Sequence, residues 1–230
     1  MRAAGRLGVA GAFALVVACG SDPGRTEPGD EDDPLPPGAL VDELDPFDAA
    51  RWQVMDHALG RGRVAAGNVV PVAGAVEIRL PAGTFDGGEL RSAARLTHGV
   101  VEGRLRAASA PGTISALFLY EGRARRNDEV DVELLGGTRT ALLTVWREDQ
   151  QVFDTSVTLD FDPSAGFHDY RITWTADRVV WHVDGKVVAT AGGLALGADL
   201  FLYVNAWWPT WLQGGPAPAG AAAVVERLVT

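Results

Sequence analysis

The segment that most constrains the fold spans residues 128–136 and reads Asp-Glu-Val-Asp-Val-Glu-Leu-Leu-Gly. In an extended strand, alternate side chains share a face. One face of this strand would carry the carboxylates of Glu129, Asp131 and Glu133, and the other face three aliphatic side chains that can anchor a sheet in a core. Neighbouring carboxylates are only ~6–7 Å apart along a strand. Such crowding costs stability, but it suits chemistry that needs one carboxylate ionised and another protonated.

Strand signals recur at short intervals from residue 41 onward, whereas helical periodicity is hard to find. The Asp184-Gly185 dipeptide between two apolar runs predicts a β-hairpin. Many short strands without helices predict an all-β fold, an antiparallel two-sheet sandwich of the jelly-roll type whose concave sheet offers a substrate groove. The segments expected as strands are residues 68–72, 75–80, 89–96, 100–107, 114–120, 129–135, 141–147, 152–159, 168–175, 178–183, 186–189, 200–207 and 223–229.

The first 40 residues predict export and a tether. Residues 1–18 combine a basic start with an apolar run too short to span a bilayer, as in a signal peptide. This run ends at Cys19, the only cysteine, in a pattern similar to a bacterial lipobox. We therefore expect lipidation at Cys19 and a bacterial cell-envelope lipoprotein, facing the periplasm or the outside; an ordinary signal peptide with an incidental cysteine is the alternative. Residues 19–40 are acidic and proline-rich, which predicts a solvated tether before a folded domain of residues 41–230.

Composition and net charge restrict the classes of partner and cofactor that fit this chain. Apolar residues make up 47% of the chain, which indicates a globular body. The formal net charge of −10 argues against a nucleic-acid partner and fits a neutral substrate. The four histidines show no metal-ligand spacing, so we expect no metal and no cofactor. We expect a monomer that meets the membrane only through its lipid anchor.

Paired carboxylates are the machinery of glycoside hydrolysis, in which one acts as an acid and the other as a nucleophile or base. Retaining enzymes hold the two groups ~5–5.5 Å apart. Glu129 and Glu133 are separated by ~13 Å along a straight strand, so the strand must bend or the side chains must lean together. The alternative is a half-buried strand with a solvated acidic face.

Residues 128–136 resemble the signature of glycoside hydrolase family 16, in the uninterrupted form of bacterial lichenases and plant xyloglucan-modifying enzymes. The resemblance implies a concanavalin A-like jelly roll. It also implies that Glu129 is the nucleophile, Glu133 the general acid/base, and Asp131 the residue that tunes them. Further segments similar to the family are residues 85–92, 160–170, 181–185 and 204–207, with Trp174 and Trp211.

The same resemblance implies a set of substrate-binding residues: Glu89, Arg91, Thr144, Trp146, Asn205, Trp207 and Trp211. Glu89 and Arg91 match sugar-hydroxyl contacts, although a surface ion pair is the alternative. For Trp52, Trp174 and Trp181 we expect core packing, and Trp208 fits either role. Some family members hold a structural calcium, but no ligands for it can be traced in this chain.

The function implied is a retaining endo-β-glucanase acting on a polysaccharide, with mixed-linkage 1,3-1,4-β-glucan favoured. Alternatives are a transglycosylase, a hydrolase of laminarin, xyloglucan or galactan, and a carbohydrate-binding lipoprotein without turnover. Four departures from the lichenase pattern bear on the substrate. They are Asn127 in place of tryptophan, Thr144 in place of an amide, no loop asparagine in residues 55–64, and a basic loop at 122–126, which would favour an acidic or sulfated sugar.

Overall fold

The computed structural model describes residue 35 and residues 37–230. The expected signal peptide, Cys19 and most of the tether lie outside these residues. Leu40 and Thr230 lie side by side, since their backbones exchange hydrogen bonds of 2.8 and 3.0 Å. Within the described residues, none of the helical structure is long and apolar enough to traverse a bilayer.

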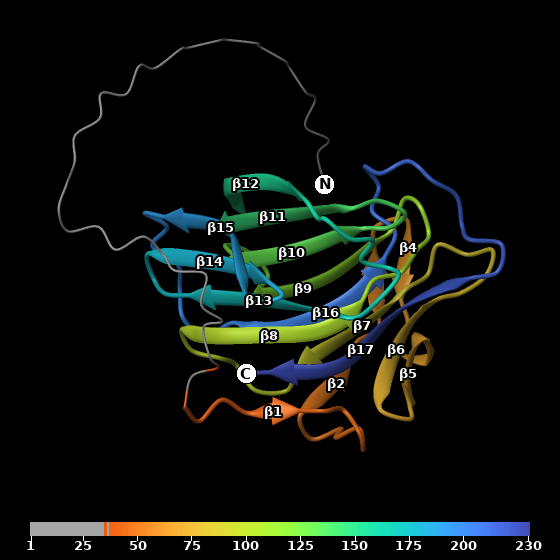
Figure 1. Ribbon diagram of the computed structural model, residues 1–230, viewed down its shortest axis with the longest axis horizontal. Coiled ribbons are helices and arrows are strands. Elements are labelled where there is room, and N and C mark those ends of the chain that lie inside the picture. The colour runs from red at the N-terminus through yellow and green to blue at the C-terminus, as the bar shows by residue number, and fades with distance from the viewer. Residues whose placement is uncertain (1–34, 36) are drawn as a thin grey trace, which may run out of the picture. The chain divides into compact units, whose positions relative to one another are not determined.

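Two antiparallel sheets make up the body (Figure 1). The back sheet runs in the order β15 (Lys186–Gly192), β14 (Arg178–Val183), β13 (His168–Trp174), β8 (Gly99–Arg106), β17 (Ala221–Val229), β6 (Ala75–Leu80) and β5 (Val69–Val72), and β1 (Val41–Asp42) also pairs with β17. The front sheet runs in the order β12 (Gln150–Thr158), β11 (Thr140–Arg147), β10 (Glu129–Leu135), β9 (Ile114–Tyr120), β16 (Phe201–Trp207), β7 (Gly88–Ser92) and β2 (Trp52–Val54). A separate hairpin joins β3 (His57–Leu59) to β4 (Gly62–Val64), and a 3-10 turn covers Ala66–Asn68.

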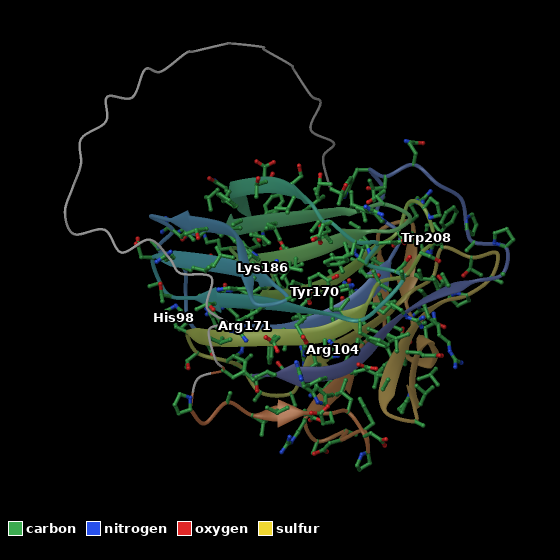
Figure 2. The ribbon with its side chains drawn as sticks, in the orientation of Figure 1. His98, Arg104, Tyr170, Arg171, Lys186 and Trp208 are labelled. Atoms are coloured by element: carbon green, nitrogen blue, oxygen red, sulfur yellow. The ribbon has the colours of Figure 1, made fainter. Side chains whose placement is uncertain are left out.

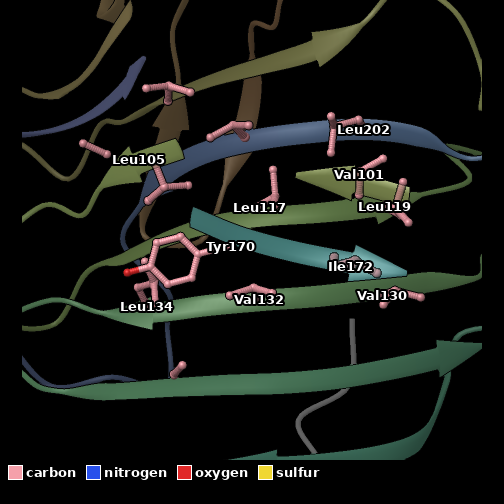
Figure 3. Packing of buried hydrophobic residues seen from close by; sticks show 14 of the residues in the cluster. Val101, Leu105, Leu117, Leu119, Val130, Val132, Leu134, Tyr170, Ile172 and Leu202 are labelled. Atoms are coloured by element: carbon pink, nitrogen blue, oxygen red, sulfur yellow. The ribbon is translucent and has the colours of Figure 1, made fainter. Parts of the chain in front are cut away.

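The core lies between the two sheets (Figure 3). Val101 and Ile172 from the back sheet face aliphatic side chains of the front sheet such as Val130 and Val132, and all four are buried. Successive side chains of a strand point to opposite faces, so alternate residues of each strand enter this core. The alternation in residues 129–135 therefore leaves its acidic set on the outer face of the front sheet.

The expected fold class is confirmed, and most of the expected strands are present. Residues 75–80, 114–120, 129–135 and 178–183 are strands with the expected bounds. The expected hairpin at Asp184 and Gly185 joins β14 to β15, with φ angles of 49° and 79° that suit this dipeptide.

Two kinds of expectation were wrong. The segment 89–96 ends as a strand at Ser92, whose hydroxyl donates to the carbonyl of Ala94 and accepts from the Leu202 amide, so the chain turns away. The segment 186–189 instead continues to Gly192. Strands β1 to β4 were not expected, since each has only two or three residues and shows no alternation.

Most tryptophans belong to the core. Trp52, Trp174 and Trp181 are buried, as expected. Trp208, labelled in Figure 2, is also fully buried and packs edge-on against Phe85 at a centroid distance of 5.6 Å. Its position resolves the two roles left open by the sequence in favour of packing.

The back sheet carries a network of ion pairs that includes Arg104 and Arg171 (Figure 2). Glu102 is buried and accepts from Arg171 at 2.8 Å and from Arg227 at 3.0 Å. Arg227 also reaches Asp169 at 2.8 Å. These ion pairs link β8, β13 and β17 of the back sheet through their side chains.

Candidate active site

The outer face of the front sheet is hollowed into a cleft of about 340 Å³. Glu129, Asp131 and Glu133 of β10 all line it. Their neighbours Val130, Val132 and Leu134 are buried in the core. The remaining lining residues are Met55, His57, Leu59, Glu89, Ala116, Phe118, Tyr120, Tyr203, Asn205 and Trp207.

Strand register arranges the cleft in rows. Glu133 on β10 lies opposite Ala116 on β9, which in turn lies opposite Asn205 on β16, and Asn205 is opposite Glu89 on β7. Three strand spacings separate Glu133 from Glu89, or roughly 14 Å along the sheet. Because alanine is small, the row is open between its polar ends. A ligand lying across the strands would meet both ends at once.

The neighbouring row is aromatic. Asp131 lies opposite Phe118, which lies opposite Tyr203. The rings of Phe118 and Tyr203 are stacked at a centroid distance of 4.9 Å. Tyr120 meets Tyr203 edge-on at 6.0 Å. Flat apolar rings of this kind pack well against the C–H faces of sugar rings, and phenol hydroxyls supply a polar edge.

The three carboxyl groups of β10 are held at unequal proton affinities. Burial, and then the charge of Glu133, raise the pKa of Glu129 to about 7, while a hydrogen bond from Asp131 opposes this rise. Burial, and then the charge of Asp131, raise the pKa of Glu133 to about 8. Burial and the charge of Glu129 raise the pKa of Asp131 well above its usual range. Asp131 and Glu129 are hydrogen-bonded to each other, so the two carboxyl groups titrate as a pair.

Asp131 is fixed by two further contacts. The hydroxyl of Thr144 on β11 donates a hydrogen bond to Oδ2 of Asp131. The indole Nε1 of Trp181, reaching across the core from the back sheet, donates to the Asp131 backbone carbonyl at 3.0 Å. The carboxyl group is therefore positioned by β11, and its backbone by the opposite sheet.

At the other end of the row, Glu89 is buried and held by two side chains. Nε2 of His57 lies 2.9 Å from Oε1 of Glu89, and Nδ2 of Asn205 donates to Oε2 at 3.1 Å. Burial lowers the pKa of His57, but the hydrogen bonds to Glu89 and to the Ala58 carbonyl outweigh burial and raise it overall. The cleft thus has an imidazole–carboxyl pair at one end and three carboxyl groups at the other.

The β3–β4 hairpin brings His57 over the front sheet. Its turn contains Gly60, where an added Cβ would lie 2.1 Å from the Trp208 carbonyl oxygen. The Arg61 amide donates to that same carbonyl at 2.9 Å, and the Met55 amide donates to the Glu89 carbonyl at 2.9 Å. Only glycine allows this close approach. The hairpin is therefore docked against β16 and β7, and it closes one side of the cleft.

The start of β10 is fastened by two carboxylates, the buried Asp128 and the exposed Asp149. Asp128 accepts hydrogen bonds from the amides of Glu148, at 3.0 Å, and Gly197, at 2.6 Å. Asp149 accepts from the backbone and side-chain amides of Asn127. Asn127, a departure from the lichenase pattern, is thus part of the turn that positions Glu129.

The residues predicted from the sequence divide into two groups. Glu129, Asp131, Glu133, Glu89, Asn205 and Trp207 line the cleft together, whereas Arg91, Thr144, Trp146 and Trp211 do not line it. Arg91 lies over the Phe201 ring at 4.3 Å and bonds Gln53, so the alternative of a surface ion pair with Glu89 is wrong. Trp146 is the strand partner of Glu129, and Trp211 is 53% exposed.

Several cleft residues were missed by sequence reasoning. Phe118 and Tyr120 alternate with the buried Leu117 and Leu119, so the strand is apolar on both faces and hides its periodicity. The aromatic outer face was nevertheless a usable signal. His57 gave none, because its partner Glu89 is 32 residues away.

Among residues 35 and 37–230, no group of three or more His, Cys, Asp or Glu side chains is arranged to hold a metal ion.

The fold and the cleft define a jelly-roll protein with an acidic, aromatic-lined groove. A solved structure with this fold is a prokaryotic beta-1,3-1,4-glucanase (lichenase) derived from a mouse hindgut metagenome, with a TM-score of 0.76 and 21% identity, covering 83% of this chain and 97% of that one. Residues 62–218 match the glycosyl hydrolases family 16, and the chain belongs to this family.

Curated relatives agree with this assignment. A beta-glucanase of Acetivibrio thermocellus is 35% identical over 107 residues, which are 45% of this chain and 32% of that protein. A beta-glucanase of Paenibacillus macerans is 30% identical over 126 residues, 54% of this chain and 53% of that protein. The chain thus spans about a third to a half of the length of these relatives.

Proposed function

We propose that this protein is a retaining endo-β-glucanase whose substrate is mixed-linkage 1,3-1,4-β-glucan. The observation that carries the proposal is that Glu129 and Glu133 line one cleft, with Asp131 between them on the same strand and the pKa values of both glutamates raised. One carboxyl group must be ionised to attack and the other protonated to release the leaving group. The uninterrupted form of residues 128–136 and the beta-glucanase relatives support the choice of substrate.

In the proposed reaction, Glu133 protonates the glycosidic oxygen while the carboxylate of Glu129 attacks the anomeric carbon. The bond to the leaving sugar breaks as the glycosyl–enzyme ester forms. Glu133, now ionised, removes a proton from water, which attacks the same carbon and releases Glu129. Two inversions give net retention of configuration. Asp131 shares its proton with Glu129 and disfavours ionisation of Glu133 until the first step.

Separate Glu129→Gln and Glu133→Gln substitutions test these roles. Each amide keeps the size of the side chain but removes the nucleophile or the proton donor, so we expect the release of reducing ends from barley glucan to fall by roughly 10²–10⁴-fold or more. Unfolding by urea should show that both variants are folded. A matched control is Glu77→Gln on β6, which lies on the back sheet beside Arg79 and should leave the rate unchanged.

A panel of barley glucan, laminarin, xyloglucan, agarose and carrageenan then tests the substrate. Barley glucan should give the highest rate of new reducing ends. Near-normal turnover by either glutamine variant would remove the proposed roles, whereas faster turnover of another polysaccharide would change only the substrate. Export and lipidation at Cys19 stay predictions of the sequence.

A further inference from the structure

Each ring nitrogen of His57 contacts an oxygen atom. Nδ1 lies 3.1 Å from the carbonyl oxygen of Ala58, and Nε2 lies 2.9 Å from Oε1 of Glu89. Both partners are acceptors when Glu89 is ionised, and a neutral imidazole has only one N–H. A neutral ring must therefore give up one contact, whereas an imidazolium keeps both.

Glu89 is placed to bind hydroxyl groups once it is held in this way. The side chain is only 4% exposed, and its two oxygens are fixed from opposite sides by His57 and Asn205. A carboxylate has about four lone-pair positions, so roughly two remain open to the cleft. Glu89 thus offers a fixed pair of acceptors to a ligand.

Asn205 supplies an independent sign of a ligand. Its Oδ1 atom is buried and has no hydrogen-bond partner among the described residues. A buried acceptor without a donor is destabilising. The atom belongs to a residue that lines the cleft beside Glu89, so a hydroxyl donor bound there would satisfy it.

The surroundings of His57 favour its cationic form. Asp56 precedes it in the chain and is bonded to Arg63 of β4, and burial is outweighed by the contact with Glu89 in raising the pKa of His57. The other titratable or charged side chains facing the cleft or adjoining Glu89 are Arg91, Tyr120, Glu129, Asp131, Glu133 and Tyr203.

We propose that His57 is a positioning residue: as an imidazolium it holds the Glu89 carboxylate in the orientation that accepts sugar hydroxyls, so that this end of the cleft binds a neutral glucan best while His57 carries its proton. The inference rests on the proposed function for the identity of the sugar. Loss of the proton removes the ring charge and leaves one N–H for two acceptors, so the contact with Glu89 competes with that to the Ala58 carbonyl and Glu89 is less firmly oriented.

The first measurement is independent of turnover. The ring signals of His57 are followed by NMR as pH is varied in the full chain and in its Glu89→Gln variant, with His57→Gln used to assign the signals. Because the Glu89 carboxylate stabilises the imidazolium, Glu89→Gln should move the titration of His57 to lower pH. An unchanged titration would show that the two side chains are not paired and would overturn the proposal.

The second measurement uses cellotetraose as the probe and the Glu133→Gln background, so that the probe is not consumed. Affinity should fall roughly three- to tenfold between about pH 6 and about pH 9 as the imidazolium charge is lost. The double variant with His57→Gln retains a donor but no charge, and its affinity should lack this step. The same step in both proteins would assign it to Glu129 or another group and contradict the role of His57.

Turnover separates this proposal from the function on which it rests. With barley glucan, His57→Gln should raise KM more than it lowers kcat, and the dependence of KM on pH should flatten. If the unsubstituted protein cleaves no polysaccharide, the proposed function fails, while the NMR titration and the cellotetraose affinities still decide the role of His57.

Discussion

At the scale of single residues, the hydrogen bonds of Asp131 link the carboxyl groups of the cleft to their surroundings. Asp131 hydrogen-bonds Glu129 and accepts from Thr144, so its carboxyl group has a donor on one side and an acceptor on the other. Asparagine has the same shape and can make the same two contacts, but it cannot ionise. Asp131 is therefore the position where geometry and charge can be separated.

We expect Asp131→Asn to shift the pH dependence of kcat/KM. In the unsubstituted protein, activity should rise as Glu129 ionises, with a pKa of about 7, and fall as Glu133 loses its proton, with a pKa of about 8. Both limbs belong to the coupled groups as a set. Because the charge of Asp131 raises the pKa of Glu133, the asparagine variant should lose activity at lower pH on the alkaline side.

Asp131→Ala is the comparison for this experiment. Alanine removes the donor to Glu129 as well as the charge, so activity should fall further than in the asparagine variant, by roughly 10–100-fold relative to the unsubstituted protein. Equal losses in the two variants, with no movement of the alkaline limb, would show that Asp131 acts only by filling space.

At the scale of elements, strand β10 is set in place by the side chain just before it. Asp128 is buried and is the acceptor for two backbone amides, from the turn after β11 and from the loop before β16. These bonds join three segments that are far apart in the sequence. The position of the carboxylate row therefore depends on a residue that does not line the cleft.

Replacing Asp128 by alanine should leave two amides without an acceptor and lower the free energy of unfolding by about 1–3 kcal/mol. Asp128→Asn retains one carbonyl oxygen and should cost less. Urea unfolding of both variants measures the difference. If alanine were tolerated as well as asparagine, solvent would have to satisfy the two amides.

The elements also show what could be predicted from the sequence. Strands such as β10 and β14 were predictable because polar and apolar residues alternate or because a turn dipeptide marks their end. The two-sheet arrangement followed from many such strands. Strands β2 to β4 have three residues each, and they are held by contacts with β7 and Trp208 that no local pattern encodes.

The part of the site that lies on β10 was predictable from the sequence, and the part contributed by other strands was not. The three carboxyl groups lie on one strand, so their spacing reveals their shared face. His57, Tyr120 and Tyr203 reach the cleft from three other strands or hairpins, and only the fold brings them together. Conversely, Trp208 is of a residue type that often binds sugars, but its side chain is buried in the core.

At the scale of the whole molecule, the cleft costs stability. A carboxyl group whose pKa is raised by folding stabilises the fold below its unfolded pKa, and that contribution is lost as pH rises through the folded pKa. The pKa values of Glu129, at about 7, and Glu133, at about 8, are both raised. The protein should therefore become less stable between weakly acidic and alkaline pH.

Glu133→Gln should remove part of this loss. Relative to the unsubstituted protein, we expect it to raise the free energy of unfolding by about 1–3 kcal/mol above pH 8. This gain should shrink as pH falls and vanish below about pH 4.5, where the glutamate is protonated in both the folded and the unfolded state. Urea unfolding at several pH values measures this. Glu43→Gln, at an exposed position, is the control. Parallel curves for the unsubstituted and Glu133→Gln proteins would mean that groups other than Glu133 cause the loss of stability at high pH.

The pairing of Leu40 with Thr230 has a practical consequence. Both ends of the folded body leave from the rim formed by β1 and β17, in the sheet that contributes no lining to the groove. A surface, a resin or a fused partner attached at either end would thus hold the protein by the same rim, and long polymer chains could still thread across the opposite sheet.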